Sequence, residues 1–343
     1  MPLTTAELTA HPAYKHLDWK LPASREGYVT VAEGRRGGPF KVWYELHGKG
    51  PTRLVLIMGL GAYRTAWKRQ TRYFGHQRAD DYSVLVFDNR GIGKSGKPST
   101  RYSTSEMAYD VVDLLVGIGW LDASYQPTQG QKLNIAGVSM GGMIAQEVGL
   151  ILPQGTINTL VLCSTAPRLV RTIPFVANLR QRVSMFIPRD LDVQLEETAL
   201  RLFSRRFLQV PDTEADEPFS GGPEGGNFPT NRDRYCAGEV DKRSDKVGFT
   251  PKGFMLQAIA AGWHHKSARQ LAELGDQVGR KRMAVCHGTD DNMITFPHAE
   301  LLHEELGDEI EYKVWPGAGH VLMWEEEHEF NAWLEDFIQR QGK

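Results

Sequence analysis

The sequence predicts an α/β fold in which helices flank a mostly parallel central sheet and a mainly helical cap interrupts the core. Three observations support this prediction. Short apolar runs alternate with helical patterns, the apolar runs are continuous, and the alternation stops once, between about Pro167 and Gly248. Continuous apolar strands are typical of a sheet that is covered on both faces, and strand-helix alternation is typical of parallel sheets.

Seven segments are predicted to be strands, because each is a short, largely apolar run bounded by turn signals. They are residues 41–48, 53–59, 83–88, 132–138, 157–163, 282–287 and 309–315. Two helices are predicted most clearly. The first begins with the capping-box spacing of Ser103 and Glu106, and its apolar stripe is Met107, Val111, Leu114, Leu115 and Ile118. The second lies near the end of the chain and has the stripe Phe330, Trp333, Leu334, Phe337 and Ile338.

The interrupted region predicts an inserted cap, because the strand pattern resumes after it. It contains the loop-like stretch SGGPEGGNFPTNRD. We expect a first core part over residues 1–166, a cap over 167–260 and a second core part over 261–343. The insertion is apolar and aromatic, so we expect it to close over the substrate as a lid. Its aromatic residues include Phe175, Phe186, Phe203 and Phe207. The alternative is an insertion that only decorates the fold or mediates dimerisation.

Composition limits the classes of function. The 343 residues are 41% hydrophobic and 24% charged, so the chain can bury a sizeable core. The net charge is -2 and no basic stripe occurs, which argues against a nucleic-acid partner. The N-terminus has no apolar signal region and no apolar run has spanning length, so we expect a cytoplasmic protein without a membrane span. Cys163 and Cys286 lie in strand-like runs, which favours reduced core thiols. The oligomeric state is left open.

Residues 137–141, GVSMG, form a G-x-S-x-G motif between a predicted strand and a helix. This is the context of a nucleophile elbow, a strained turn that pushes a serine hydroxyl out of the sheet. Such a serine needs a base, and the base needs an acid that orients it. Asp290 and Asp291 follow one later strand, and His320 follows the last strand. The order predicts Ser139 as nucleophile, His320 as base and one of the two aspartates as acid.

These motifs resemble those of the alpha/beta-hydrolase superfamily, over about residues 40–165 and 250–343. The family spacing of glycine, two residues and acid, counted from Gly288, implies Asp291 as the triad acid. The resemblance also implies an oxyanion hole built from the backbone N–H groups of Leu60 and Met140. Leu60 lies in the segment 58–61, where many relatives have His-Gly.

Residues 87–98, FDNRGIGKSGKP, match the glycine spacing of a dinucleotide-binding loop. No helix follows at once, and a P-loop would require glycine in place of Asp88, so both phosphate-binding interpretations fail. The stretch resembles the family's D-x-R-G-x-G-x-S loop instead, which implies that Gly91 and Gly93 shape a turn beside the active site. We expect no cofactor.

A metal site is also not expected. His298, Glu300, His303 and Glu304 lie close together, but their spacing is that of an exposed charged helix face rather than of a ligand set.

The function predicted from the sequence is a cofactor-free serine hydrolase that cleaves a carboxylic ester of a small or medium apolar molecule. The segments GFMLQAIAAGWHH, HGTDD and GAGH resemble the branch of small-molecule esterases and methylesterases. Trp263 and His264 are candidates for lining the substrate cavity, and ordinary packing is an equal alternative for them. Two other functions stay open: a proline-directed aminopeptidase or other acyl-transfer enzyme with the same triad, and a non-hydrolytic ligand receptor or cyclase.

Overall fold

The computed structural model describes residues 2–172, 189–220 and 225–341 and confirms the predicted α/β architecture. An eight-stranded sheet has the order β1-β2-β4-β3-β5-β6-β7-β8. The strands are β1 (Arg25–Val31), β2 (Phe40–Gly48), β3 (Thr52–Ile57), β4 (Tyr82–Phe87), β5 (Leu133–Val138), β6 (Ile157–Cys163), β7 (Met283–Gly288) and β8 (Glu311–Trp315). Strands β2 to β8 match the seven predicted segments. The edge strand β1 was not predicted, because its residues are largely exposed or half-buried and form no continuous apolar run.

Strand direction brings the predicted site residues to one edge of the sheet. The pairs β1–β2 and β2–β4 are antiparallel, and every pair from β4 to β8 is parallel. Parallel strands end at the same edge. Ser139, Asp291 and His320 follow β5, β7 and β8, so all three lie at the carboxyl edge.

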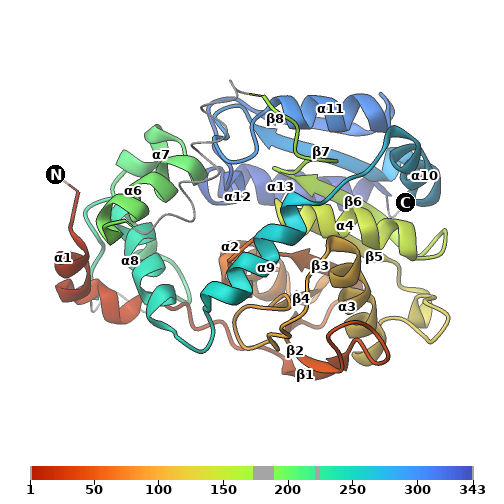
Figure 1. Cartoon of the computed structure of the whole chain (residues 1–343), viewed down its shortest axis with the longest axis horizontal. Coiled ribbons are helices and arrows are strands. Elements are labelled where there is room, and N and C mark those ends of the chain that lie inside the picture. Colours follow the sequence, from red (N-terminus) through yellow and green to blue (C-terminus); the bar gives the residue numbers. More distant parts are fainter. Residues whose placement is uncertain (1, 173–188, 221–224, 342–343) are drawn as a thin grey trace.

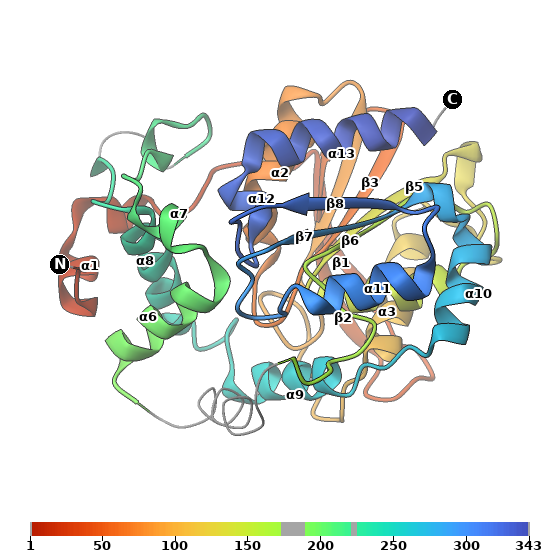
Figure 2. The same ribbon diagram turned by 90° about the horizontal axis from the view of Figure 1, so that it is seen from above.

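Helices cover both faces of the sheet (Figures 1 and 2). Alternate strand residues point to opposite faces, so Val55 and Ile57 lie in one core while Leu54 and Leu56 lie in the other. The first core is completed by α3 (Thr104–Gly117), α4 (Met140–Ile151), α10 (Ala268–Val278) and α11 (Pro297–Leu306). On the opposite face lie α2 (Lys68–Arg72), α12 (Leu322–Glu325) and α13 (Glu327–Gln341).

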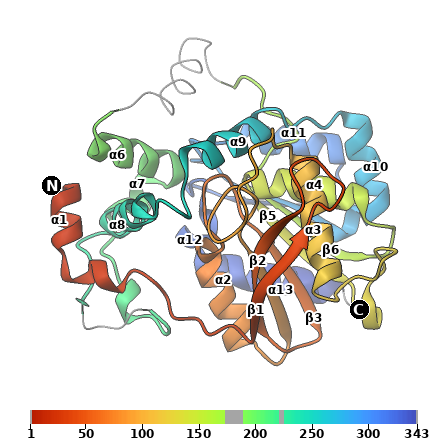
Figure 3. The same ribbon diagram turned by 60° about the horizontal axis from the view of Figure 1, so that its bottom comes forward.

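A separate helical unit lies beyond the carboxyl ends of β7 and β8 (Figure 2). It contains α1 (Thr5–Ala10), α6 (Leu191–Leu202), α7 (Arg205–Gln209) and α8 (Asn231–Ser244). Its own core joins Leu8 of α1 to Phe203, Phe228 and Tyr235. The N-terminal helix therefore packs with residues of the expected cap, rather than with the sheet (Figure 3). The boundaries at 166/167 and 260/261 stay predictions.

Helix α9 (Pro251–Gly262) lies between this unit and the sheet core (Figure 3). Phe203 and Phe207 stack on each other with ring centroids 5.2 Å apart, whereas Phe175 and Phe186 fall outside the described residues. Cys163, Cys236 and Cys286 are buried free thiols. Among the helices that the structure describes, none is both long enough and apolar enough to cross a membrane.

Candidate active site

Ser139 occupies a strained turn between β5 and α4. Its backbone angles are φ 58° and ψ -124°, a combination that a residue with a side chain rarely adopts. The flanking glycines are needed, since a Cβ at Gly137 would lie 2.3 Å from the Gly141 carbonyl oxygen. The turn is fixed from the next strand, because the Ser139 N–H donates to the Cys163 carbonyl at 2.9 Å. This conformation is the one that a nucleophile elbow requires.

Asp291 and His320 are joined by a short hydrogen bond. His320 Nδ1 lies 2.7 Å from Asp291 Oδ2, and both side chains are buried. The other carboxylate oxygen, Oδ1, accepts the backbone N–H groups of Met293 at 2.8 Å and Ile294 at 2.9 Å. Because Nδ1 donates to a carboxylate, Nε2 is the ring nitrogen of His320 that is left to accept a proton.

The neighbouring Asp290 has different surroundings. Its side chain is exposed, and its carboxylate accepts only a 3.3 Å hydrogen bond from Thr289 among the described residues. Burial by itself would raise the pKa of Asp291, but the charge of His320 and hydrogen bonds from His287 and His320 hold that pKa well below its usual range. Asp291 is therefore the aspartate that stays ionised beside a histidine.

His287, the penultimate residue of β7, was missed by the sequence reasoning. Its ring is fully buried, with Nε2 3.0 Å from Asp291 Oδ2 and 2.7 Å from the Ile294 carbonyl oxygen. A histidine at the carboxyl end of a parallel strand, four residues before the predicted acid, was the available signal. The Asp291 carboxylate thus receives hydrogen bonds from two imidazoles and two backbone N–H groups.

The predicted oxyanion loop lies directly against Ser139. A Cβ at Gly59 would lie 3.0 Å from the Ser139 Cβ. The N–H groups of Leu60 and Met140 donate to no other residue that the structure describes, which leaves both donors available. Asn89 Nδ2 donates to the Met58 carbonyl at 2.8 Å and fixes the start of this loop.

Gln257 of α9 supports the other end of the oxyanion loop. Its Oε1 accepts the Gly61 N–H at 2.9 Å, and its Nε2 donates to the Arg90 carbonyl at 2.8 Å. The side chain is fully buried. Sequence reasoning noted that the usual histidine of this loop is missing, but it did not find Asn89 or Gln257, because these contacts join distant segments.

The glycine-rich loop folds around its own aspartate. Asp88 Oδ2 accepts the Lys94 N–H at 2.9 Å, and a Cβ at Gly93 would lie 2.2 Å from that oxygen. Asp88 also binds the Arg64 side chain, with Oδ2 3.0 Å from Nη1. The interpretation of these glycines as turn residues is confirmed.

A half-buried glutamate connects the helical unit to the loop of His320. Glu325 Oε1 accepts the N–H groups of Ser204 at 2.8 Å and Gly319 at 3.0 Å, and Oε2 accepts the Ser204 hydroxyl at 2.5 Å. The Val321 N–H donates to the Leu202 carbonyl at 3.0 Å. The end of α6 therefore contacts residues on both sides of His320.

Trp263 and His264 lie at the end of α9 in different surroundings. Trp263 is 73% exposed and stacks under Arg101. His264 is buried, with Nδ1 2.9 Å from the Thr104 hydroxyl of α3. Both sets of contacts favour packing, and the substrate-lining role of these residues stays a prediction.

The group of His298, Glu300, His303 and Glu304 falls on α11, as expected, but it is not an exposed face throughout, because His298 is buried. His298 is buried and donates from Nδ1 to the Thr295 carbonyl at 3.0 Å, while its Nε2 accepts the Val170 N–H at 3.2 Å. His303 stacks on Tyr312 instead. Within the described residues, no three His, Cys, Asp or Glu side chains come together as a metal site would need.

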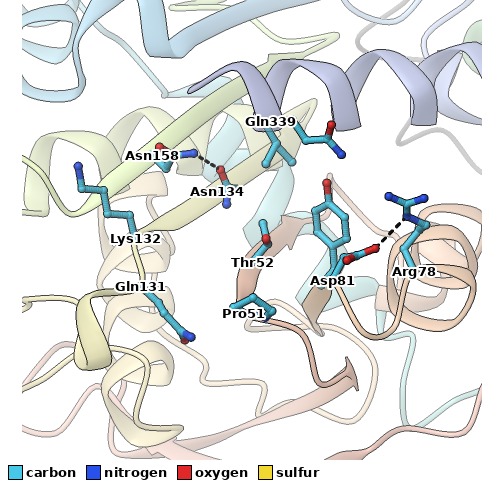
Figure 4. A pocket seen from close by; sticks show the side chains of 11 residues that line it. Pro51, Thr52, Arg78, Asp81, Gln131, Lys132, Asn134, Asn158 and Gln339 are labelled. Atoms are coloured by element: carbon cyan, nitrogen blue, oxygen red, sulfur yellow. Dashed lines mark hydrogen bonds and ion pairs between the residues drawn. The ribbon is translucent and has the colours of Figure 1, made fainter. Parts of the chain in front are cut away.

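A cavity of about 380 Å³ lies away from Ser139 and His320. Figure 4 shows the side chains that line it. Its lining includes Thr52, Tyr82 and Asn158 at or near the amino ends of β3, β4 and β6. Ser139 and His320 follow the carboxyl ends of their strands, so this cavity is at the opposite edge of the sheet. The candidate site is therefore identified by the side chains at the carboxyl edge of the sheet rather than by the volume of this cavity.

Comparisons with known proteins agree with the architecture. The family model described as "Alpha/beta hydrolase family" matches residues 46–333. The chain is 26% identical over 305 residues to the dihydrolipoyllysine-residue acetyltransferase component of the acetoin cleaving system of Pseudomonas putida, covering 89% of this chain and 68% of that one. It is 28% identical over 156 residues to 3-oxoadipate enol-lactonase 2 of Acinetobacter baylyi, covering 46% of this chain and 51% of the relative.

Among solved structures, the chain is similar to a thermophilic esterase from Thermogutta terrifontis. The TM-score is 0.67 at 20% identity, and the alignment covers 92% of this chain and 100% of the esterase. At this identity the likeness establishes a shared fold.

Proposed function

The chain belongs to the alpha/beta hydrolase family, and on that premise we propose that it is a cofactor-free serine hydrolase acting on a carboxylic ester of a small or medium apolar molecule. The observation that carries this proposal is the 2.7 Å hydrogen bond between Asp291 and His320, at the sheet edge where Ser139 occupies its strained turn. One relative is named as an enol-lactonase, and a lactone is a cyclic ester. Its name supports an ester-type bond.

In the proposed reaction, Ser139 Oγ attacks the ester carbonyl while His320 Nε2 takes the hydroxyl proton. Asp291 fixes the imidazole and stabilises the imidazolium that forms. The imidazolium then gives its proton to the departing alkoxide, which leaves an acyl group on Ser139. His320 next takes a proton from water, the water oxygen attacks the acyl carbon, and the acid is released as Ser139 regains its proton.

The negative charge of both tetrahedral intermediates develops on the former carbonyl oxygen. The free N–H groups of Leu60 and Met140 are suited to stabilise it, because a backbone donor that is already in place needs no reorganisation during the reaction. Asn89 and Gln257 keep the Leu60 donor in position through their bonds to the oxyanion loop.

The test is labelling by a fluorophosphonate followed by peptide mass analysis, together with hydrolysis of p-nitrophenyl esters of increasing chain length. We expect an adduct on Ser139 and the fastest turnover with short or medium esters. Ser139→Ala is expected to lose the adduct and to lower kcat by about 10⁴-fold or more. Folded wild-type protein that neither forms the adduct nor cleaves any ester would contradict the proposal and favour a receptor or cyclase.

A second candidate is acyl transfer by the same acyl-enzyme. The similarity to a protein named as an acetyltransferase component, which covers 89% of this chain, favours it. An alcohol or thiol acceptor would then replace water in the second step. Product analysis with competing acceptors separates the two reactions, since a transferase yields mostly the new ester or thioester. A proline anilide in the same panel tests the aminopeptidase alternative.

The proposed function includes a lid formed by the expected cap, residues 167–260. Three contacts support it: Gln257 binds the oxyanion loop, Leu202 accepts the Val321 N–H beside His320, and Ser204 binds Glu325, which also holds Gly319. A lid at this edge excludes water and strengthens the electrostatic interactions of the site. An insertion that serves only dimerisation would not need to contact both the oxyanion loop and the loop of His320.

A further inference from the structure

His287 lies behind the predicted triad and contacts Asp291 from the buried interior. The ring is fully buried in β7, and Nε2 faces two oxygen acceptors, Asp291 Oδ2 at 3.0 Å and the Ile294 carbonyl at 2.7 Å. Neither acceptor carries a hydrogen. The proton of His287 must therefore be on Nε2, which donates to both oxygens.

The other ring nitrogen of His287 takes no part in this contact. Nδ1 is buried and has no hydrogen-bond partner among the described residues. A second proton there would be a buried donor without an acceptor, which is more costly than an unpaired lone pair on a neutral ring. Other titratable groups around His287 are few: Asp291, His320, and His298, whose two nitrogens are already bonded to the backbone. The geometry thus makes His287 a hydrogen-bond donor to Asp291 through Nε2.

Two effects follow from this donor. It occupies the same carboxylate oxygen that His320 uses, so Oδ2 is held by two imidazoles while two backbone N–H groups hold Oδ1. It also binds the end of the 289–294 loop to β7 through the Ile294 carbonyl. We propose that His287 is a positioning residue that fixes the rotamer and the acceptor strength of Asp291, and through it the orientation of His320.

This inference rests on the proposed function, but it makes a separate claim. The first test compares His287→Leu, which removes the donor, with His287→Gln, which returns an amide N–H near the position of Nε2. His303→Leu is the matched control, because that histidine stacks on Tyr312. For hydrolysis of p-nitrophenyl butyrate we expect His287→Leu to lower kcat about 10- to 100-fold with little change in KM, because misplacing a catalytic group mainly costs turnover. His287→Gln is expected to recover most of that loss.

The pH profile gives a readout that a merely structural role would not change. Without the second donor, the Asp291 carboxylate interacts more strongly with a protonated His320, so the acid limb of kcat should move to higher pH in His287→Leu. We expect His287→Gln and His303→Leu to keep the wild-type limb. If the leucine variant does not fold by circular dichroism, His287→Met replaces it, since a flexible thioether fills irregular buried sites.

A spectroscopic measurement separates the two proposals. The proton between His320 and Asp291 is followed as a downfield ¹H NMR signal, which needs no substrate. We expect that signal to shift or broaden in His287→Leu and to be retained in His287→Gln, even if wild-type protein proves unable to cleave any ester. A folded leucine variant with wild-type kcat, pH profile and downfield signal would overturn the positioning role.

Discussion

Asp290 and Asp291 show how far one residue's surroundings determine its chemistry. The two carboxylates are adjacent in sequence, yet one is exposed and the other is buried against two imidazoles. We expect Asp291→Asn to lower kcat by about a thousandfold or more, because an amide cannot stabilise the imidazolium and favours the wrong tautomer. Asp290→Asn should stay within about tenfold of wild type. Ester hydrolysis by both variants, each checked for folding by circular dichroism, decides the assignment, and the reverse ranking would refute it.

A sequence gives its clearest prediction of a site where the proposed chemistry requires a local motif. Ser139 lies in a five-residue pattern with its own backbone requirement, and the acid and base follow it in a fixed order. His287, Asn89 and Gln257 carry no such pattern. Gln257 reaches the oxyanion loop across 196 positions of the chain, and only the folded structure brings the two together. The supporting residues of a site are therefore harder to predict than its reacting groups.

At the scale of elements, Glu325 and Glu326 form a natural comparison at the junction of helical unit and core. Glu325 is mostly buried and satisfies two backbone N–H groups and one hydroxyl, whereas Glu326 pairs with the exposed side chain of Arg206. We expect Glu325→Ala to lower the free energy of unfolding by about 2–4 kcal/mol, since it leaves buried donors unpaired. Glu326→Ala should cost about 1 kcal/mol or less.

Activity provides a second readout for the same pair. Gly319 directly precedes His320, so releasing its N–H should also lower kcat, by about tenfold, in Glu325→Ala. Urea denaturation and ester hydrolysis of both variants provide the measurements. Equal stability and equal activity of the two alanine variants would show that Glu325 does not couple α6 to the loop of His320.

His264 joins the end of α9 to α3 and α4 through Thr104 and Gln146. We expect the packing of these three helices to be sensitive to pH. Burial, together with the positive charges of Lys266 and His265, lowers the pKa of His264 to about 3 from 6.5. Between these two pH values the unfolded chain binds a proton that the folded chain excludes. The stabilising contribution is therefore complete above about pH 6.5 and is lost progressively as the pH falls toward 3.

The corresponding variant is His264→Gln, which is neutral throughout this range. We expect its free energy of unfolding to fall less steeply than that of wild type between pH 6.5 and 4, as measured by urea denaturation at several pH values. His328→Gln is the matched control, because its side chain is exposed and it is not one of the groups that shift the pKa of His264. Identical slopes for wild type and His264→Gln would exclude His264 as the source of acid sensitivity.

The alternation of strands and helices predicted seven of the eight strands of the sheet, because each buried strand needs a continuous apolar run. Strand β1 escaped detection, since an edge strand with one exposed face has no such run. Sequence periodicity also could not show whether the first 20 residues pack with the core or with the cap. Helix α1 packs on α8 through Leu8, and a six-residue helix gives no sequence signal of which surface it will cover.

For the whole molecule, a buried ionic cluster connects the helical unit to the core. Glu214 of the helical unit accepts hydrogen bonds from Lys68, from Arg69 at 2.9 Å and from the Trp19 indole at 2.9 Å. Lys68 and Arg69 belong to α2 of the core. Burial would raise the pKa of Glu214, but Lys68, Arg69 and Arg234 lower it to about 2.

Removing one partner of a buried ion pair leaves uncompensated charge, so Glu214→Gln should lower the free energy of unfolding by about 3–5 kcal/mol. Glu217→Gln is the matched control. Glu217 pairs with Arg72, which lies on α2 like Lys68 and Arg69, but the Glu217 side chain is 31% exposed. Its loss should therefore cost about 1 kcal/mol or less. The stabilisation by Glu214 is present above about pH 4.5 and is lost as the pH falls toward 2, so the difference between wild type and Glu214→Gln should shrink in acid.

Guanidinium denaturation, followed by both circular dichroism and tryptophan fluorescence, measures these differences. Because Glu214 links two parts of the molecule that each have a core, we expect the two probes to coincide in wild type and to separate in Glu214→Gln, where the helical unit unfolds first. That order matters for the proposed activity, since the same unit contacts the loop of His320. If Glu214→Gln and Glu217→Gln lose equal, small amounts of stability and both unfold in one transition, the cluster is not what couples the helical unit to the sheet.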